Sequence, residues 1–177
     1  MYIISRKGQY GIEKKKAKKL GLFGLIFLLA SVVGLILAVV GICIDFFTAS
    51  LLGHSGGMAL FEEGLADGGV PIALVQAFAI ISLALTAIAC IITVLGSFGV
   101  IRVGGLAKFI GAALVIVVAV LVIVFAASWA SEFVPSDGIL GGIADAAKYS
   151  VAPAAGAYLV MIGGVVSGAS MLLAKLK

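Results

Sequence analysis

An uncharged run occupies residues 20–44 and reads LGLFGLIFLLASVVGLILAVVGICI. As a helix it spans roughly 37 Å at about 1.5 Å per residue, enough to cross the ~30 Å hydrocarbon core of a bilayer. A lysine-rich segment, KKKAKK, precedes it at residues 14–19. The run is longer than the apolar core of a secretory signal, which covers about 7–15 residues. We therefore predict a retained transmembrane helix that continues to about residue 47.

The composition of the whole chain indicates an integral membrane protein. Of the 177 residues, 63% are hydrophobic and 11% are charged, which leaves too little polar surface for a water-soluble globule. Seven of the twelve Lys and Arg residues precede residue 20, beside the first span. No basic patch is interleaved with aromatic residues, so nucleic acid is not an expected partner. We expect contact with anionic lipid head groups instead, through Lys14, Lys15, Lys16, Lys18 and Lys19.

Three further apolar runs predict three further membrane crossings. The expected fold is an all-α integral membrane protein, an antiparallel and left-handed bundle of four transmembrane helices with two short outer loops. A basic cytoplasmic segment, residues 1–19, precedes a single transmembrane domain, residues 20–177. In the first outer loop, Gly pairs bracket Met58–Ala66, and this piece is expected to form two turns of helix. The predicted spans are residues 20–47, 70–101, 109–131 and 152–174.

The distribution of basic residues predicts the orientation. Seven Lys and Arg precede the first span, two lie in the connection 102–108 and two close the chain, whereas only Lys148 lies on the opposite side. Lys and Arg are concentrated in the cytoplasmic segments of membrane proteins. The protein is therefore predicted to be multi-pass with both termini cytoplasmic.

Small residues form seams along the predicted helices. They recur every three or four positions in the first helix, at Ser31, Gly34, Ala38, Gly41, Asp45 and Thr48. Such seams let helix backbones approach closely, and a seven-residue repeat favours a left-handed crossing. The fourth helix has the broadest small face, which packs either against neighbouring helices of the same chain or against another copy or a partner protein. That face comprises Gly156, Gly163, Gly164, Ser167 and Gly168.

Side chains that could carry chemistry are few. Asp45 is the only acid within an apolar run, and its place near the end of the run lets it reach water. A possible outer cation site combines Asp45, Glu62 and Asp67. His54 is the only histidine, and without a cysteine cluster it predicts no metal site. We therefore expect neither an enzyme nor a cofactor.

The layout resembles that of claudin-like, MARVEL and tetraspanin proteins, which have four spans, internal termini, two outer loops and a short inner connection. Claudins and tetraspanins carry paired cysteines in an outer loop. Here Cys43 and Cys90 both fall inside predicted spans, at different depths. The resemblance is limited to layout, so it assigns no family and transfers no functional residue.

Two functions remain open from the sequence. The first is a structural role, in which the protein packs laterally as a homo-oligomer or as an accessory subunit of a larger membrane complex. The alternative is an oligomeric, cation-permeable channel or transporter with an acidic outer vestibule, in which hydroxyls of the second helix line a path. These hydroxyls belong to Ser82, Thr86 and Thr93.

The predicted orientation can be tested by thiol labelling of intact cells. A Ser136→Cys variant should react with a membrane-impermeant reagent added outside, whereas Lys15→Cys should react only after permeabilisation. The parent chain, with Cys43 and Cys90, gives the background labelling. The reverse pattern would contradict the orientation.

Overall fold

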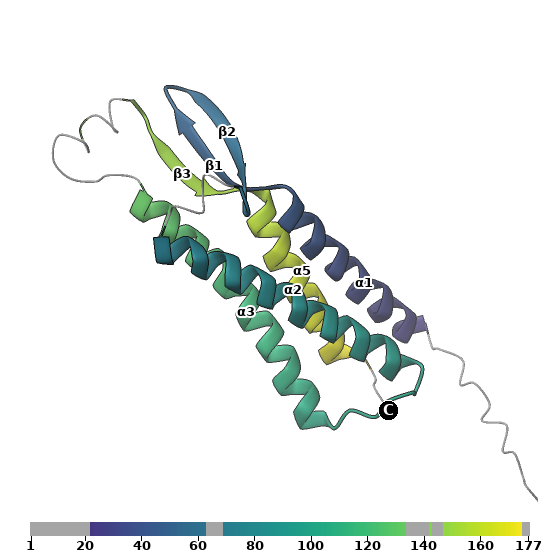
Figure 1. Ribbon diagram of the computed structural model, residues 1–177. Coiled ribbons are helices and arrows are strands. Elements are labelled where there is room, and N and C mark those ends of the chain that lie inside the picture. The colour runs from purple at the N-terminus through teal and green to yellow at the C-terminus, as the bar shows by residue number, and fades with distance from the viewer. Residues whose placement is uncertain (1–21, 63–68, 134–141, 143–146, 175–177) are drawn as a thin grey trace, which may run out of the picture.

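The computed structural model describes residues 22–62, 69–133, 142 and 147–174 (Figure 1). Four helices in this part of the chain are long and apolar enough to cross a membrane. The protein is therefore a mostly helical, multi-pass membrane protein, as the sequence predicts. These helices are α1 (Leu22–Cys43), α2 (Gly69–Ser97), α3 (Gly105–Phe133) and α5 (Ala155–Leu173).

A small antiparallel sheet corrects the all-α prediction. Its strands are β1 (Asp45–Leu51), β2 (His54–Ala59) and β3 (Ser150–Pro153), in the order β2-β1-β3. The first helix ends at Cys43 rather than near residue 47, because the chain continues as a strand from Asp45. The fourth span begins at Ala155 rather than 152, because β3 occupies the preceding residues.

The sequence of the connection between α1 and α2 explains why a strand forms there. Residues 45–51, DFFTASL, include aromatic and β-branched side chains, which favour extended backbone. A two-residue loop follows, and it pairs Leu51 with His54 across the hairpin. The prediction of a helix over Met58–Ala66 is wrong at its start, because Met58 and Ala59 belong to β2. The last residues of that predicted helix, 63–66, lie outside the described ranges. Pairing with β1 outweighs the local helix preference of these residues.

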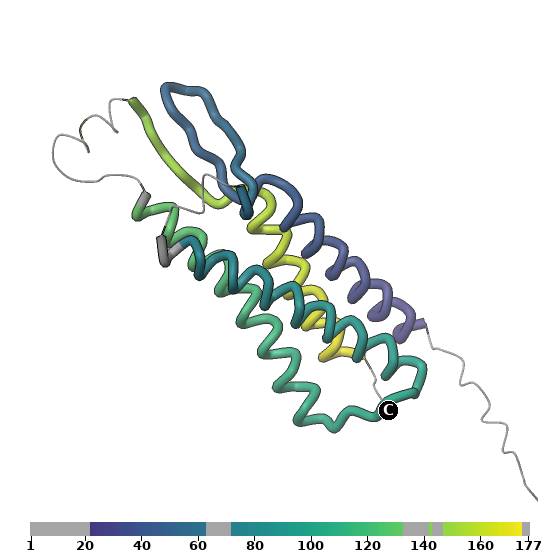
Figure 2. The backbone as a smooth tube through the Cα atoms, in the orientation of Figure 1, coloured from purple at the N-terminus to yellow at the C-terminus, as the bar shows by residue number. Residues whose placement is uncertain are grey.

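Helix α5 lies among the other three helices. It packs against α1, α2 and α3, and α2 also packs against α1 and α3. Figures 1 and 2 show α5 (yellow) behind α2, between α1 and α3. The buried residues of α1 are Ser31, Gly34, Ala38 and Gly41, so this part of the predicted seam faces the other helices. Its last two predicted members, Asp45 and Thr48, lie in β1 instead.

Aromatic side chains fix the sheet onto the helix ends. The register shifts between Asp45 and Phe47, and such an irregularity lets the consecutive residues Phe46 and Phe47 both point inward. Both side chains are fully buried, and the Phe47 ring lies 4.5 Å from the Trp129 ring of α3, centroid to centroid. The Gln76 side chain of α2 donates a hydrogen bond of 2.9 Å to the carbonyl of Leu60, just after β2. The sheet and the helices therefore share one core.

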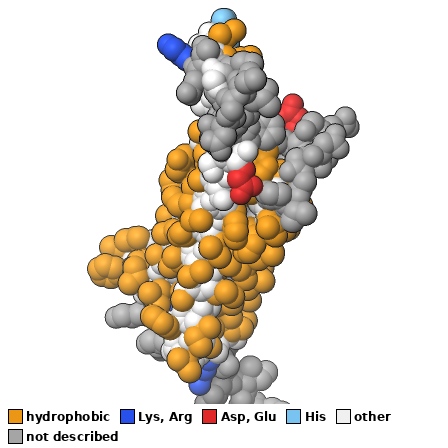
Figure 3. Space-filling view, turned by 90° about the vertical axis from the view of Figure 1, so that its left-hand side faces the viewer, with side chains coloured by type: hydrophobic (Ala, Val, Ile, Leu, Met, Phe, Trp, Pro, Cys, Tyr) orange, Lys and Arg blue, Asp and Glu red, His pale blue; other side chains and the backbone are white. Residues whose placement is uncertain are grey.

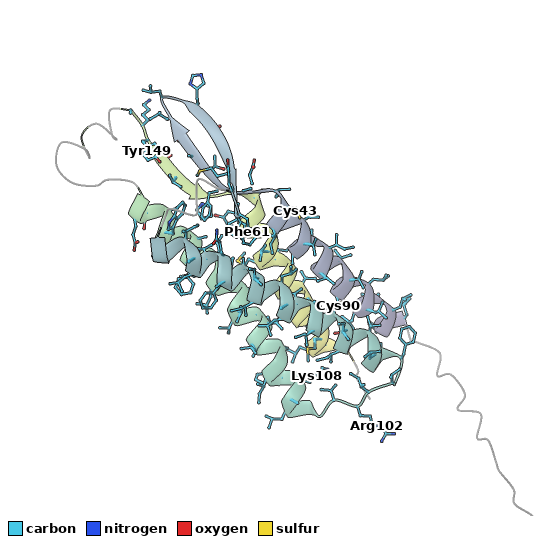
Figure 4. The ribbon with its side chains drawn as sticks, viewed as in Figure 1. Cys43, Phe61, Cys90, Arg102, Lys108 and Tyr149 are labelled. Carbon is cyan, nitrogen blue, oxygen red and sulfur yellow. The ribbon has the colours of Figure 1, made fainter. Side chains whose placement is uncertain are left out.

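Apolar side chains cover the outward faces of the helices (Figure 3). Leu, Ile, Val and Phe residues along all four helices remain exposed in the isolated chain. Arg102 and Lys108 lie at the end of the helices away from the sheet (Figure 4), and Lys108 donates a hydrogen bond to the carbonyl of Ala174, at the end of α5. An apolar outer surface with charged residues at the helix ends is typical of a protein whose helices are surrounded by lipid.

The shared aromatic core predicts that Phe47 stabilises the sheet and the helices together. Replacing a buried Phe by Ala costs about 3–5 kcal/mol in soluble proteins. Phe47→Ala should therefore lower the thermal unfolding temperature in mild detergent and expose the hairpin to protease. Leu51→Ala, at an exposed position of the same strand, is the control and should change stability by less than about 0.5 kcal/mol. Equal melting of the two variants would contradict a shared core.

Candidate functional site

The small face of α5 is the candidate site that the structure describes most fully. All five of its predicted residues are buried. Gly156 and Gly163 face α1, where a Cβ on Gly41 would lie 2.6 Å from the carbonyl oxygen of Gly156. A Cβ on Gly34 would lie 2.7 Å from the carbonyl oxygen of Gly163. Real Cβ atoms do not approach backbone this closely, so the α1–α5 contact depends on glycine in both helices.

The other side of the small face lies against α3. A Cβ on Gly164 would lie 2.5 Å from the Cβ of Ala119, and one on Gly168 would lie 2.8 Å from Cγ1 of Ile116. Of the two alternatives that the sequence left open, the structure places this face in contacts within one chain. It brings the five residues together with α1 and α3 and leaves none of them on the outer surface.

Buried hydroxyls connect three helices between these glycines. The hydroxyls of Ser31 in α1 and Ser167 in α5 lie 3.2 Å apart, and Ser167 also donates to the carbonyl of Thr86 in α2 at 3.4 Å. A hydroxyl has a single proton. When Ser167 donates to Thr86, Ser31 is therefore the donor to Ser167. An interhelical bond of this kind contributes on average about 0.6 kcal/mol in a membrane protein, so the network fixes register more than it adds stability.

The hydroxyls of α2 mostly turn back onto their own helix. Thr86 donates to the carbonyl of Ser82 at 2.7 Å, and Thr93 donates to that of Ala89 at 2.8 Å. The hydroxyl of Ser82 is buried, has no hydrogen-bond partner among the described residues and lies close to Gly164. All three side chains are fully buried between helices. Ser82 and Thr86 lie beside Gly164 of α5, so two of the three residues of the predicted polar path belong to a helix contact.

The acidic residues of the predicted cation site lie at the base of the hairpin. Asp45 begins β1, and its carboxylate lies over Gly57 of β2. Asp45 pairs with Ala59 across the hairpin, and the backbone N–H of Ala59 donates to the Glu62 carboxylate at 3.2 Å. Both acids are exposed at the same end of the hairpin. The third predicted member, Asp67, lies outside the described residues, as do the five lysines predicted to contact head groups.

No group of three or more His, Cys, Asp or Glu side chains that could hold a metal ion occurs within residues 22–62, 69–133, 142 and 147–174. Cys43 and Cys90 are free thiols, on different helices and at different heights (Figure 4).

Sequence reasoning missed the three-stranded sheet and the turn between β1 and β2. One signal for them exists: the loop Leu52-Gly53 separates two runs that are rich in strand-forming or small residues. A two-residue loop with Gly in second place is a hairpin signal, but Leu in first place weakens it. The apolar run of α1 continues to Ile44 without a break, which conceals the change from helix to strand.

Comparisons with known proteins return no match: no family model, no curated protein and no solved structure matches the chain.

The tight fit at Gly164 predicts that a single methyl group is harmful there. Gly164→Ala places a Cβ against Ala119 and should destabilise the chain by about 1–3 kcal/mol through overpacking. The matched control is Gly105→Ala, because a Cβ at that position meets nothing within 4 Å. Thermal unfolding in detergent and membrane yield would separate the two variants. Normal yield with loss of an oligomer in Gly164→Ala would instead assign this face to an intermolecular contact.

Proposed function

We propose that the protein is a structural membrane protein. In this proposal, four antiparallel helices in a left-handed bundle hold the small sheet on one side of the membrane. Both termini face the cytoplasm, so the sheet lies outside. The protein then packs laterally, as a homo-oligomer or as an accessory subunit of a larger membrane complex.

The observation that carries this proposal is the central place of α5. Its glycines and Ser167 are engaged with α1, α2 and α3, so the polar and small groups of the helices serve packing. Direct contact between α2 and α5 also fills the centre of the four helices. The shared aromatic core makes the sheet a rigid extension of the helices. These features favour a scaffold that presents a surface rather than a site that turns over a substrate.

Lateral packing then uses a surface other than the small face of α5. Of the four spans, α1 is the least buried. Its outward side chains include Leu29, Val33 and Ile36. We place the lateral contact on this side of α1.

The channel remains the second candidate, and one observation favours it. Asp45 and Glu62 are both exposed at the base of the hairpin, where they would make an outer mouth negative. Because α2 and α5 fill the centre of a single chain, a pore would have to form between several copies. The basic lysines before α1 would in either case contact anionic lipid head groups on the cytoplasmic side.

Two measurements on the purified protein distinguish these functions. Extraction in mild detergent followed by mass determination should give more than one copy or a co-purifying subunit. Liposomes that contain the protein should show no cation flux beyond that of empty liposomes. A monomer without partners would contradict lateral packing, and a robust cation leak abolished by Asp45→Asn would establish the channel instead.

A further inference from the structure

The outward face of α1 carries a continuous row of large apolar side chains that ends in a cysteine. Its members are exposed in the single chain and recur at alternating intervals of four and three residues along the whole helix. None of them is charged, so two copies of this row can meet without repulsion. We call this row the α1 seam: Leu22, Ile26, Leu29, Val33, Ile36, Val40 and Cys43.

Side-chain size distinguishes the α1 seam from the exposed faces of the other long helices. The spacing alone does not, because the exposed face of any straight helix repeats in nearly this way. A row that is large throughout can interlock with a copy of itself, each side chain entering a hole between four residues of the facing helix. The exposed faces of α2 and α3 are interrupted by alanines, at Ala77 and Ala84 and at Ala113 and Ala127.

Side-chain branching along the α1 seam matches a pair of parallel helices. Numbered as a heptad repeat, its a positions are all β-branched: Ile26, Val33 and Val40. Leucine occupies two of its four d positions, which are Leu22, Leu29, Ile36 and Cys43. In parallel coiled coils, β-branched residues at a with leucine at d favour two strands over three or four. The shape of the seam therefore favours a dimer.

Membrane insertion supplies the matching geometry. Because every copy of a membrane protein crosses the bilayer in the same sense, two α1 helices that meet within one membrane run parallel. A two-fold axis along the membrane normal then relates the copies and brings equal positions opposite each other. A seven-residue repeat stays in contact over the full helix length when the pair crosses at about +20° in the left-handed sense. Cys43 of one copy would then face Cys43 of the other.

We propose that two copies of the chain dimerise through the α1 seam as a parallel, left-handed pair of helices. The inference rests on the proposed lateral packing and names its partner, a second copy, and the residues in contact. In lipid, interlocking side chains supply the van der Waals contact on which helix association depends. If lipid chains cover the seam instead, the protein is a monomer or associates through another surface, and the experiments below distinguish these cases.

The exposed thiol of Cys43 allows a crosslinking test in native membranes with the unaltered chain. Mild oxidation should link two chains through Cys43, because a disulfide spans roughly 4.4–6.8 Å between Cα atoms and facing d positions are the closest residues of a parallel pair. Cys43→Ser should abolish the linked dimer, whereas Cys90→Ser, which removes the buried thiol, should leave it unchanged. A Cys43→Ser chain with Val39→Cys carries an exposed thiol beside the seam and should lose most of the linked dimer.

Truncation of the seam tests the same contact without cysteine chemistry. Leu29→Ala with Ile36→Ala should raise the dissociation constant of the dimer in mild detergent by more than about tenfold, because two large side chains of each copy lose their contacts. The matched control is Ile88→Ala with Ile91→Ala on the outward face of α2. The seam residues are 53% and 54% exposed and the control residues 52% and 56%, so the two variants remove similar exposed surface. The control should leave the dimer unchanged.

The outcomes separate this inference from the proposed function. An assembly that is unaffected by Leu29→Ala with Ile36→Ala, or a dimer that is not linked through Cys43, would overturn the α1 seam while lateral packing stands. A single copy bound only to a different subunit would have the same meaning. A wild-type monomer without any partner would contradict lateral packing and the dimer together.

Discussion

The close approach of α5 to α1 is the constraint on which the rest of the structure depends. Glycines on both helices bring the backbones together where any Cβ would collide with a carbonyl oxygen, at Gly34 with Gly163 and at Gly41 with Gly156. In a bilayer the lipid chains are as apolar as the side chains, so helix association depends on such contact rather than on the hydrophobic effect. The Ser31–Ser167 hydrogen bond fixes the register of this contact. On the other side of α5, Gly164 and Gly168 lie against α3, and α2 contacts all three of these helices.

The same contact places the sheet. Gly41 and Gly156 lie near the ends of α1 and α5 from which β1 and β3 extend, so the two strands start side by side. The backbone N–H of Ala154 donates to the carbonyl of Phe46 at 2.9 Å, directly at this junction. Phe46 and Phe47 then fill the space above the helix ends against Trp129. The hairpin is therefore positioned by the packing of α1 against α5.

Sequence reasoning predicted the membrane-spanning part because its signals are long and uniform. Four uncharged runs and the spacing of Ser31, Gly34, Ala38 and Gly41 are enough to place the helices and the inner face of α1. The sheet was missed because its signals are short and conflict with their surroundings. The apolar run of α1 extends to Ile44, and Met58 and Ala59 favour helix locally, but pairing with β1 makes them a strand. The sequence also left open whether the small face of α5 packs against helices of the same chain or against another protein. That choice depends on tertiary packing, which has no local sequence pattern.

Disulfide trapping across the α1–α5 contact tests the central claim most directly. The variant Ser31→Cys with Ser167→Cys, in a chain with Cys43→Ser and Cys90→Ser, places two thiols where hydroxyl oxygens lie 3.2 Å apart. If the small face of α5 packs within one chain, oxidation in native membranes should give a crosslink inside single polypeptides, visible as a reversible mobility shift of the monomer. Crosslinks found only between chains, as disulfide-bonded dimers, would contradict this account.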